Sequence, residues 1–165
     1  MIEQLKSFSG YPCLIFPASR ALGKDAAEIE NKLNAFLSGW VSHGTPVEGG
    51  AAILEDRFVA VAHRPMEISG CSRDDLLFFM RDLGKELGIE WLGAVRIFYR
   101  DQTGQIVDVD RLEFKKQVQA GAVTPGSIVF DTTLREVNPI LEGRFVLPAS
   151  QSWHFRLMES VLKAA

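Results

Sequence analysis

The chain has 165 residues, 47% of them hydrophobic, and a formal net charge of −3. This length fits one domain, and the composition is typical of a chain that folds around an apolar core. The 18 Lys and Arg residues are scattered along the sequence. Their distribution predicts no nucleic-acid partner and no binding to a membrane surface, and no stretch has the ~18 uninterrupted apolar residues of a membrane span.

The N-terminal segment and the cysteines indicate a cytoplasmic location. Pro12 and Pro17 interrupt the first apolar run, so it lacks the continuous apolar region of a signal peptide. Cys13 and Cys71 are too few for a disulfide framework in a domain of this size. We therefore expect a soluble, cytoplasmic protein with reduced thiols.

The first half of the chain carries strand and helix patterns in turn. The apolar run at residues 13–18 is bounded by prolines and predicts a strand. Apolar residues then recur at spacings of three and four, which predicts an amphipathic helix over residues 24–41. Residues 51–54 and 57–63 predict a β-hairpin whose two-residue connection is Glu55–Asp56.

A second helix and a second hairpin follow. The apolar run Leu76–Met80 and the stop at Gly88 predict a buried helix over residues 73–87, with a capping box formed by Ser72 and Asp75. Residues 91–100 and 105–110 predict a hairpin that turns at Gly104. The C-terminal part adds three shorter elements: a helix from the caps Asp110 and Glu113 to Ala120, a strand at 127–131, and a helix from Ser152 to Leu162.

The order of the earlier elements is strand, helix, strand, strand, helix, strand, which is the split βαβ pattern of ferredoxin-like folds. We predict a single α/β (α+β) domain over residues 1–165. Its ferredoxin-like βαββαβ core would span about 11–110, with a C-terminal strand and helix extension at about 111–165.

Residues Ser69 to Ser72 form the strongest candidate site. Cys71 precedes the expected helix, where the free N–H groups and partial positive charge of a helix end favour a thiolate nucleophile. The amides of Gly70, Cys71 and Ser72 and the hydroxyls of Ser69 and Ser72 could instead hold a small anionic ligand. The structural alternative is that Cys71 is a small packed residue and Ser72 caps its helix, and it has more weight because no base lies beside the thiol in the sequence.

The candidate general bases are His43, His63 and His154. His43 follows the first helix, and His63 ends a strand shortly before Cys71, so either could approach the thiol and complete a catalytic set. A histidine alone is more often a hydrogen-bonded structural residue.

Trp40 and Trp153 are candidate ligand-binding residues, although aromatic residues at such spacings are core residues by default. We expect no metal site, because the cysteines and histidines lack the spacing of zinc ligands, and no cofactor. The nearest approach to a phosphate loop is residues 18–25, which lack its first glycine and end in Asp25 instead of Ser or Thr.

Four short motifs together resemble a family of small bacterial proteins whose members often carry the label "ABC transporter ATPase". They are Trp-Val-Ser-His-Gly at 40–44, Ser-Gly-Cys-Ser at 69–72, Val-Phe-Asp at 129–131 and Pro-Ala-Ser-Gln-Ser-Trp-His at 148–154. The resemblance spans nearly the whole chain and supplies no reaction. It implies that these residues belong to motifs: Trp40, His43, Gly44, Ser69, Gly70, Cys71, Ser72, Trp153 and His154. Arg73 replaces an aliphatic residue of the family pattern. We reject the ATPase label, since the chain has no nucleotide-binding loop.

Two functions stay open at this stage. The first is a thiol site or a site for a small anionic ligand at Ser69–Ser72. The second is a non-enzymatic interaction module that forms a homodimer through its sheet. A ferredoxin-like sheet leaves one face bare, and residues 94–99 are apolar enough to need cover.

Overall fold

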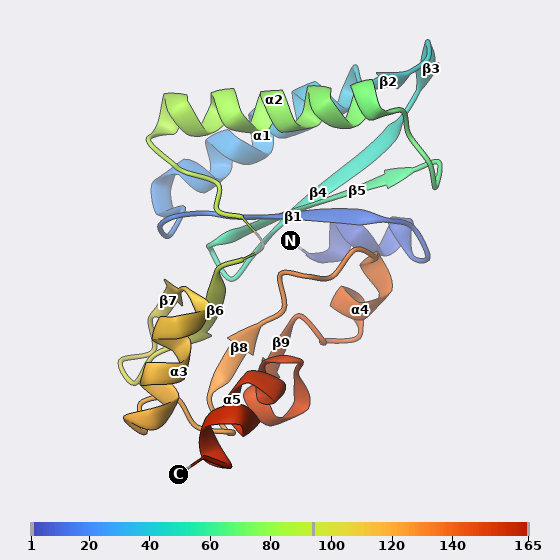
Figure 1. The fold of residues 1–165 in the computed structure, drawn as a ribbon. Helices are drawn as coiled ribbons and strands as arrows, with labels where there is room; N and C mark the ends of the chain where they lie inside the picture. The colour runs from blue at the N-terminus through green and yellow to red at the C-terminus, as the bar shows by residue number, and fades with distance from the viewer. Residues whose placement is uncertain (1, 94, 165) are drawn as a thin grey trace. The chain divides into compact units, whose positions relative to one another are not determined.

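The computed structural model describes residues 2–93 and 95–164. Helices combine with antiparallel sheets (Figure 1), as predicted. The chain forms two compact units, Met1–Leu92 with Leu134–Glu142 and Gly93–Thr133 with Gly143–Ala165. Each unit has its own sheet and its own apolar core.

The first unit contains the elements predicted for residues 13–63 and several that were not predicted. In chain order they are η1 (Ile2–Phe8), β1 (Cys13–Pro17), η2 (Gly23–Asp25), α1 (Ala26–Ser38), β2 (Val41–Ser42), β3 (Thr45–Pro46), β4 (Glu48–Leu54), β5 (Phe58–Arg64), α2 (Gly70–Leu87) and α4 (Val137–Leu141), where η marks a 3-10 helix. The strands β1, β4 and β5 and the helix α1 confirm those predictions.

An antiparallel sheet in the order β1-β5-β4 lies at the centre of this unit. Cys13 in β1 lies opposite Ala62 in β5, and Glu48 in β4 lies opposite Arg64. The residues of β5 from Phe58 onward are buried up to the last one, so both faces of the central strand are covered.

Helices cover both faces of this sheet, and two adjacent glycines of β4 let them approach. A Cβ atom on Gly49 would lie 2.6 Å from Cδ2 of Leu37 in α1. A Cβ atom on Gly50 would lie 2.3 Å from Cε2 of Phe8 in η1. Successive strand residues point to opposite faces, so α1 and η1 lie on opposite sides of the sheet (Figure 1). The prediction of a bare sheet face is therefore wrong for this unit, because η1 packs on it.

The connection between β4 and β5 is Glu55–Arg57, one residue longer than predicted. Glu55 and Asp56 have φ angles of 52° and 53°, in the region that favours glycine. The buried Arg57 holds this turn, since its Nε donates a hydrogen bond to the carbonyl oxygen of Ala18 at 2.9 Å.

The second unit has a sheet in the order β7-β6-β8-β9, with every neighbouring pair antiparallel. Its elements are β6 (Ile97–Arg100), β7 (Ile106–Val109), α3 (Arg111–Gln119), β8 (Ile128–Phe130), β9 (Val146–Pro148), η3 (Ala149–Gln151) and α5 (His154–Leu162). The β6–β7 hairpin, α3 with its cap Asp110, β8 and α5 confirm the predicted elements.

The single strand predicted over residues 91–100 is wrong. Trp91 makes an isolated antiparallel bridge to Ala18 beside β1. A turn follows, in which the N–H of Arg96 donates to the carbonyl oxygen of Gly93 at 3.2 Å, and β6 begins only at Ile97, in the second sheet. A glycine inside a strand pattern often marks such a break.

The apolar segment at residues 94–99 is not an open sheet face. Ala94 lies outside the described residues, and Val95 is exposed. Ile97 and Tyr99 are buried in the core that the sheet forms with α3 and α5. The apolar side chains at these two positions, which suggested a dimer interface, are therefore packed inside the unit itself.

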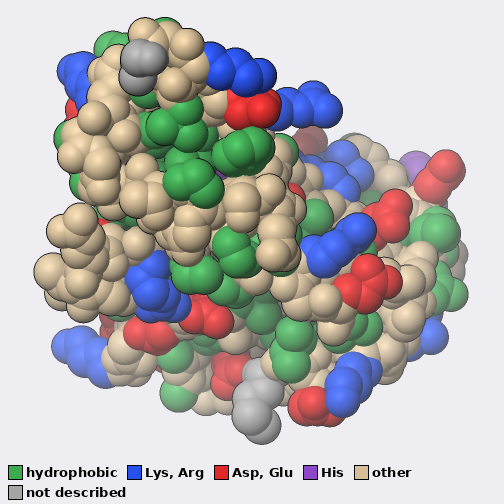
Figure 2. Space-filling view, turned by 90° about the horizontal axis from the view of Figure 1, so that it is seen from below, with side chains coloured by type: hydrophobic (Ala, Val, Ile, Leu, Met, Phe, Trp, Pro, Cys, Tyr) green, Lys and Arg blue, Asp and Glu red, His purple; other side chains and the backbone are tan. Residues whose placement is uncertain are grey.

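Charged side chains of both signs are interspersed on the surface. The face shown in Figure 2 has Lys and Arg next to Asp and Glu, as their scatter along the sequence leads one to expect. None of the helices formed by the described residues combines the length and the apolar character needed to cross a bilayer.

Candidate functional site

Helix α2 begins at Gly70 and not at residue 73, so Cys71 lies inside its first turn. Ser69 is the N-cap, and its Oγ accepts a hydrogen bond from the backbone N–H of Ser72 at 3.0 Å. The predicted capping box of Ser72 and Asp75 is therefore wrong. Ser72 is buried, and its hydroxyl donates to the carbonyl oxygen of Val41 at 2.8 Å instead of capping the helix.

Hydrogen bonds join the Trp-Val-Ser-His-Gly motif to the Ser-Gly-Cys-Ser motif. Nε1 of Trp40 donates to the carbonyl oxygen of Ser72 at 2.9 Å. The N–H of Ser69 donates to Oγ of Ser42 at 3.0 Å, and the hydroxyls of Ser69 and Ser72 lie 2.6 Å apart. Trp40 and Ser72 are buried, where such bonds are stronger than in water. The fold thus accounts for Trp40, Ser69 and Ser72 as residues that fix the start of α2.

Gly70 and Cys71 are the two residues of this turn that the fold does not explain. Both are exposed. A Cβ atom on Gly70 would meet nothing within 4 Å, and its φ is not positive, so neither space nor backbone conformation requires glycine. Their N–H groups lie at the helix start, where no intrahelical acceptor exists, and no other acceptor for them occurs within the described residues.

His63 is buried at the end of β5 and is 1% exposed. Its Nδ1 lies 2.9 Å from the carbonyl oxygen of Pro65, which fixes the proton on Nδ1. The ring packs edge-on against Trp40, with ring centroids 5.9 Å apart. Burial lowers the pKa of His63, against the opposing effect of the Pro65 bond. These contacts hold a neutral ring in the core and favour a structural role.

His43 and Gly44 form the turn between β2 and β3. Ser42 pairs with Thr45 across the hairpin, and both turn residues have positive φ, 50° and 77°. This is the geometry of a tight two-residue hairpin, so the fold also explains the His-Gly pair. Within residues 2–93, no hydrogen bond joins His43 or His63 to the thiol of Cys71. Their predicted roles as bases stay predictions.

Trp153 belongs to the second unit and stacks on the ring of His154, with centroids 3.9 Å apart. Its Nε1 donates to Oδ1 of Asp131 at 3.1 Å. His154 is fully buried, and burial lowers its pKa to about 4 although Asp131 opposes this shift. Nδ1 of His154 lies 2.7 Å from Oγ of Ser152, whereas Nε2 has no partner. His154 is thus buried, whereas Trp153 is partly buried, packs against the core of the second unit and lines a second pocket of about 410 Å³.

The two cysteines differ sharply in environment. Cys13 is 2% exposed in β1, and burial raises the pKa of its thiol to about 12. Cys71 is exposed on α2. Among the described residues, no group of three or more His, Cys, Asp or Glu side chains is placed to bind a metal ion.

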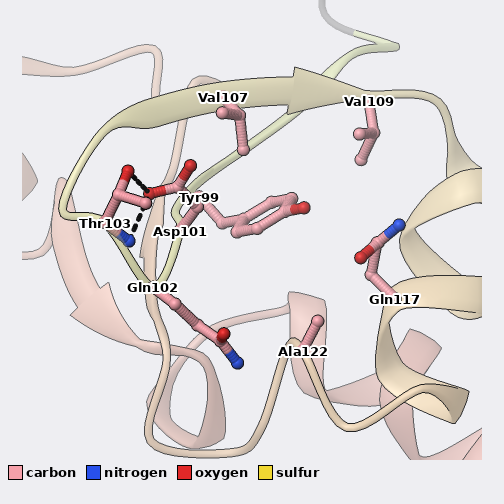
Figure 3. Close-up of a pocket in the computed structure, with 8 residues that line it drawn as sticks. All are labelled: Tyr99, Asp101, Gln102, Thr103, Val107, Val109, Gln117 and Ala122. Atoms are coloured by element: carbon pink, nitrogen blue, oxygen red, sulfur yellow. Dashed lines mark hydrogen bonds between the residues drawn. The ribbon is translucent and has the colours of Figure 1, made fainter.

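Sequence reasoning missed a pocket of about 350 Å³ in the second unit (Figure 3). Its walls come from β6, the turn after it, β7, α3 and the segment that follows α3. At one end, Oδ1 of Asp101 accepts hydrogen bonds from the N–H and the hydroxyl of Thr103, at 2.8 and 2.6 Å. The sequence predicted the turn at Asp101–Gly104, three residues of which line the pocket, but it carried no signal for a pocket there.

No family model, no curated protein and no solved structure matches this chain. The resemblance to the bacterial family therefore stays a prediction, as do the roles expected of Ser69–Ser72.

Proposed function

We propose that Cys71 is the reactive group of a small-molecule site on the first turn of α2. The observation that carries this proposal is an exposed thiol at the second position of an 18-residue helix. The N–H groups of Gly70 and Cys71 point out of the same helix end, where the helix dipole favours negative charge on the sulfur or on a bound group.

The motif contacts support this site because they fix its geometry. Trp40, Ser42 and Val41 bind the residues on either side of Gly70 and Cys71. A rigid first turn keeps the thiol and the free N–H groups in one arrangement, which lowers the entropy cost of binding. Cys13 shows the opposite environment, since burial suppresses ionisation of its thiol.

The surrounding charges favour a neutral reactant over a free anion. Arg73 supplies one cation, whereas Asp74 and Asp75 supply two carboxylates, and all three residues are exposed. A neutral electrophile, such as an activated carbon–carbon double bond, suits this balance. The sulfur would form a bond to the terminal alkene carbon and the π electrons would move to the adjacent carbonyl. The thiol proton goes to water, and water returns a proton to complete the adduct.

Alkylation of the native protein tests this site. Iodoacetamide, a neutral reagent, is compared with iodoacetate, its anionic counterpart, and mass spectrometry reads each cysteine separately. We expect Cys71 to react faster in the folded chain than in urea-denatured chain, with iodoacetamide preferred, and Cys13 to react only after unfolding. Cys71→Ser should remove the native reaction and leave the circular dichroism spectrum unchanged.

The rate of Cys71 alkylation in the folded chain, compared with the denatured chain, decides whether the proposed site stands. If folded Cys71 reacts no faster than the denatured thiol, its exposure has no chemical consequence and the proposed site is wrong.

The sheet of the first unit supports a second inference, that this unit is ferredoxin-like. Helix α1 lies between β1 and β4 in the chain and α2 follows β5, while the strands pair in the order β1-β5-β4, as in a split βαβ fold. A ferredoxin-like fold has a fourth strand beside β1. At that position this unit has the bridge from Ala18 to Trp91 and the hydrogen bond from the N–H of Leu92 to the carbonyl oxygen of Pro17. The fourth strand would then be reduced to this short contact. A backbone NMR analysis of residues 17–18 and 91–92 tests it.

Homodimerisation through this sheet is the second candidate function. In the described part of the chain, the seven-residue strand β4 has a strand partner on one side only. Two copies could pair along β4 around a two-fold axis and close both edges. Light scattering should then give twice the chain mass of 18.3 kDa. A single-chain mass at ~100 μM would contradict a dimer with the micromolar affinity of a functional interface.

A further inference from the structure

The pocket of the second unit offers apolar walls around a tyrosine. Val107, Val109 and Ala122 line it, and the ring of Tyr99 lies between them (Figure 3). The ring also contacts Phe114 edge-on, with centroids 6.1 Å apart, so its position is fixed by the core. A volume of about 350 Å³ suits a small molecule.

Two polar groups that can accept a hydrogen bond face each other across this pocket, and one of them, a tyrosine hydroxyl, can also donate. Tyr99 is 6% exposed, and its hydroxyl points toward the side-chain amide of Gln117 (Figure 3). Nε2 of Gln117 donates to Oε1 of Glu113 at 2.7 Å, which leaves Oε1 of Gln117 directed at the pocket. Among the described residues neither the Tyr99 hydroxyl nor this amide oxygen has a hydrogen-bond partner. A donor placed between them would satisfy both.

The charges near the pocket are mainly negative. Asp101 is part of the lining, and the carboxylate of Glu113 lies behind Gln117. Burial, followed by Asp101 and Glu113, raises the pKa of Tyr99, so both carboxylates act on the phenol. No Lys, Arg or His is among the described residues that line the pocket. Lys116 lies 3.9 Å from the other oxygen of Glu113 but is largely exposed, so it offsets little of this charge.

We propose that this pocket binds a small organic cation, namely a primary ammonium group on a short apolar or aromatic body. The ammonium lies between the Tyr99 hydroxyl and Oε1 of Gln117, where it donates to both. The apolar body packs on Val107, Val109 and Ala122. An ammonium carries three donors and gains from the nearby carboxylates, whereas an anion finds one donor, the Tyr99 hydroxyl, and meets the Gln117 oxygen and two carboxylates.

A set of three ligands of matched size tests the proposal on the full chain. They are 2-phenylethylammonium, the neutral 2-phenylethanol and the anionic 3-phenylpropionate, each titrated into ¹⁵N-labelled protein and followed by NMR. We expect the amine to shift the amides of β6 and α3 with a dissociation constant of about 1–10 mM. The carboxylate should bind at least about tenfold more weakly, and the amine should weaken as salt rises.

Matched variants locate the site. Ala122→Phe fills the pocket and should abolish binding, while Ala120→Phe adds the same ring at an exposed position outside the lining and should not. Tyr99→Phe keeps the ring and its contact with Phe114 but removes one acceptor, and should weaken the amine about threefold to tenfold.

Three results would each overturn the proposal. One is a carboxylate or alcohol that binds as tightly as the amine. Another is an amine that produces no saturable shift at ~50 mM, five times the weakest expected constant. The third is equal binding to the wild type, Ala122→Phe and Tyr99→Phe.

Discussion

Gly50→Ala should destabilise the first unit, because the added methyl group has no room. Its Cβ would lie 2.3 Å from Cε2 of Phe8 and 3.0 Å from Cδ2 and Cζ. Carbon atoms in contact are ~3.5–4.0 Å apart, so the ring must shift by about 1 Å or more. If the ring swings out, part of the ~1.5–3 kcal/mol gained by burying Phe8 is lost. If it stays, overpacking costs ~1–3 kcal/mol. Both routes predict that the free energy of unfolding of this unit falls by about 2 kcal/mol.

Gly70→Ala is the matched control, since it makes the same chemical change where a Cβ would meet nothing within 4 Å. Alanine is the better helix former and restricts the unfolded chain. This variant should be neutral or more stable by ~0.5–1 kcal/mol.

Pulsed alkylation of Cys13 across a urea series is the assay. Cys13 lies in β1 of the same unit and is buried until that unit opens, and a small thiol such as glutathione, added to each sample, reports the reagent concentration. With a urea dependence of ~1–3 kcal/mol per M, Gly50→Ala should lower the midpoint by roughly 1 M. A midpoint equal to that of the wild type, or an equal drop for Gly70→Ala, would refute the packing of η1 on β4.

Variants at three further residues test the surroundings of single side chains. Because burial lowers the pKa of His154 to about 4, below its usual ~6.5, the unfolded chain takes up the proton first. The unfolding free energy of the second unit should fall by roughly 3 kcal/mol between pH 6.5 and 4, and urea titrations of His154→Phe should lack this fall. Trp40→Phe removes the donor to the Ser72 carbonyl and should cost ~1–2 kcal/mol, with faster hydrogen exchange at the start of α2. Asp110→Ala removes the cap bond to the N–H of Glu113 and should cost about 1 kcal/mol of unfolding free energy, which Asp110→Asn should largely restore.

Sequence reasoning succeeded where the determining contact is short-range. Asp110 caps α3 through the N–H of Glu113, three residues away, and that spacing can be read from the sequence. The β6–β7 turn is similarly local, because Asp101 binds the N–H of Thr103. A local pattern carries this information without knowledge of the rest of the chain.

Sequence reasoning failed where a contact with a distant part of the chain decides between two structures that are both possible locally. Ser69 and Ser72 are both competent caps for α2, and Ser72 is excluded because its hydroxyl binds the carbonyl oxygen of Val41, 31 residues earlier. The segment Ile2–Phe8 has no strong helical repeat, and its place depends on the fit of Phe8 over Gly50. The pattern of residues 91–100 likewise does not reveal that β6 joins a second sheet.

The same distinction separates the motif residues into two groups. Trp40, His43 and Gly44 have structural explanations in the core and in the β2–β3 turn, as do the two serines that fix α2. A loss of activity after changing any of them would also follow from a loosened fold. Gly70 and Cys71 have no such explanation, since both residues are exposed and a Cβ atom on Gly70 would meet nothing within 4 Å. An activity that disappears in Cys71→Ser at unchanged stability would therefore have to be a property of the thiol itself.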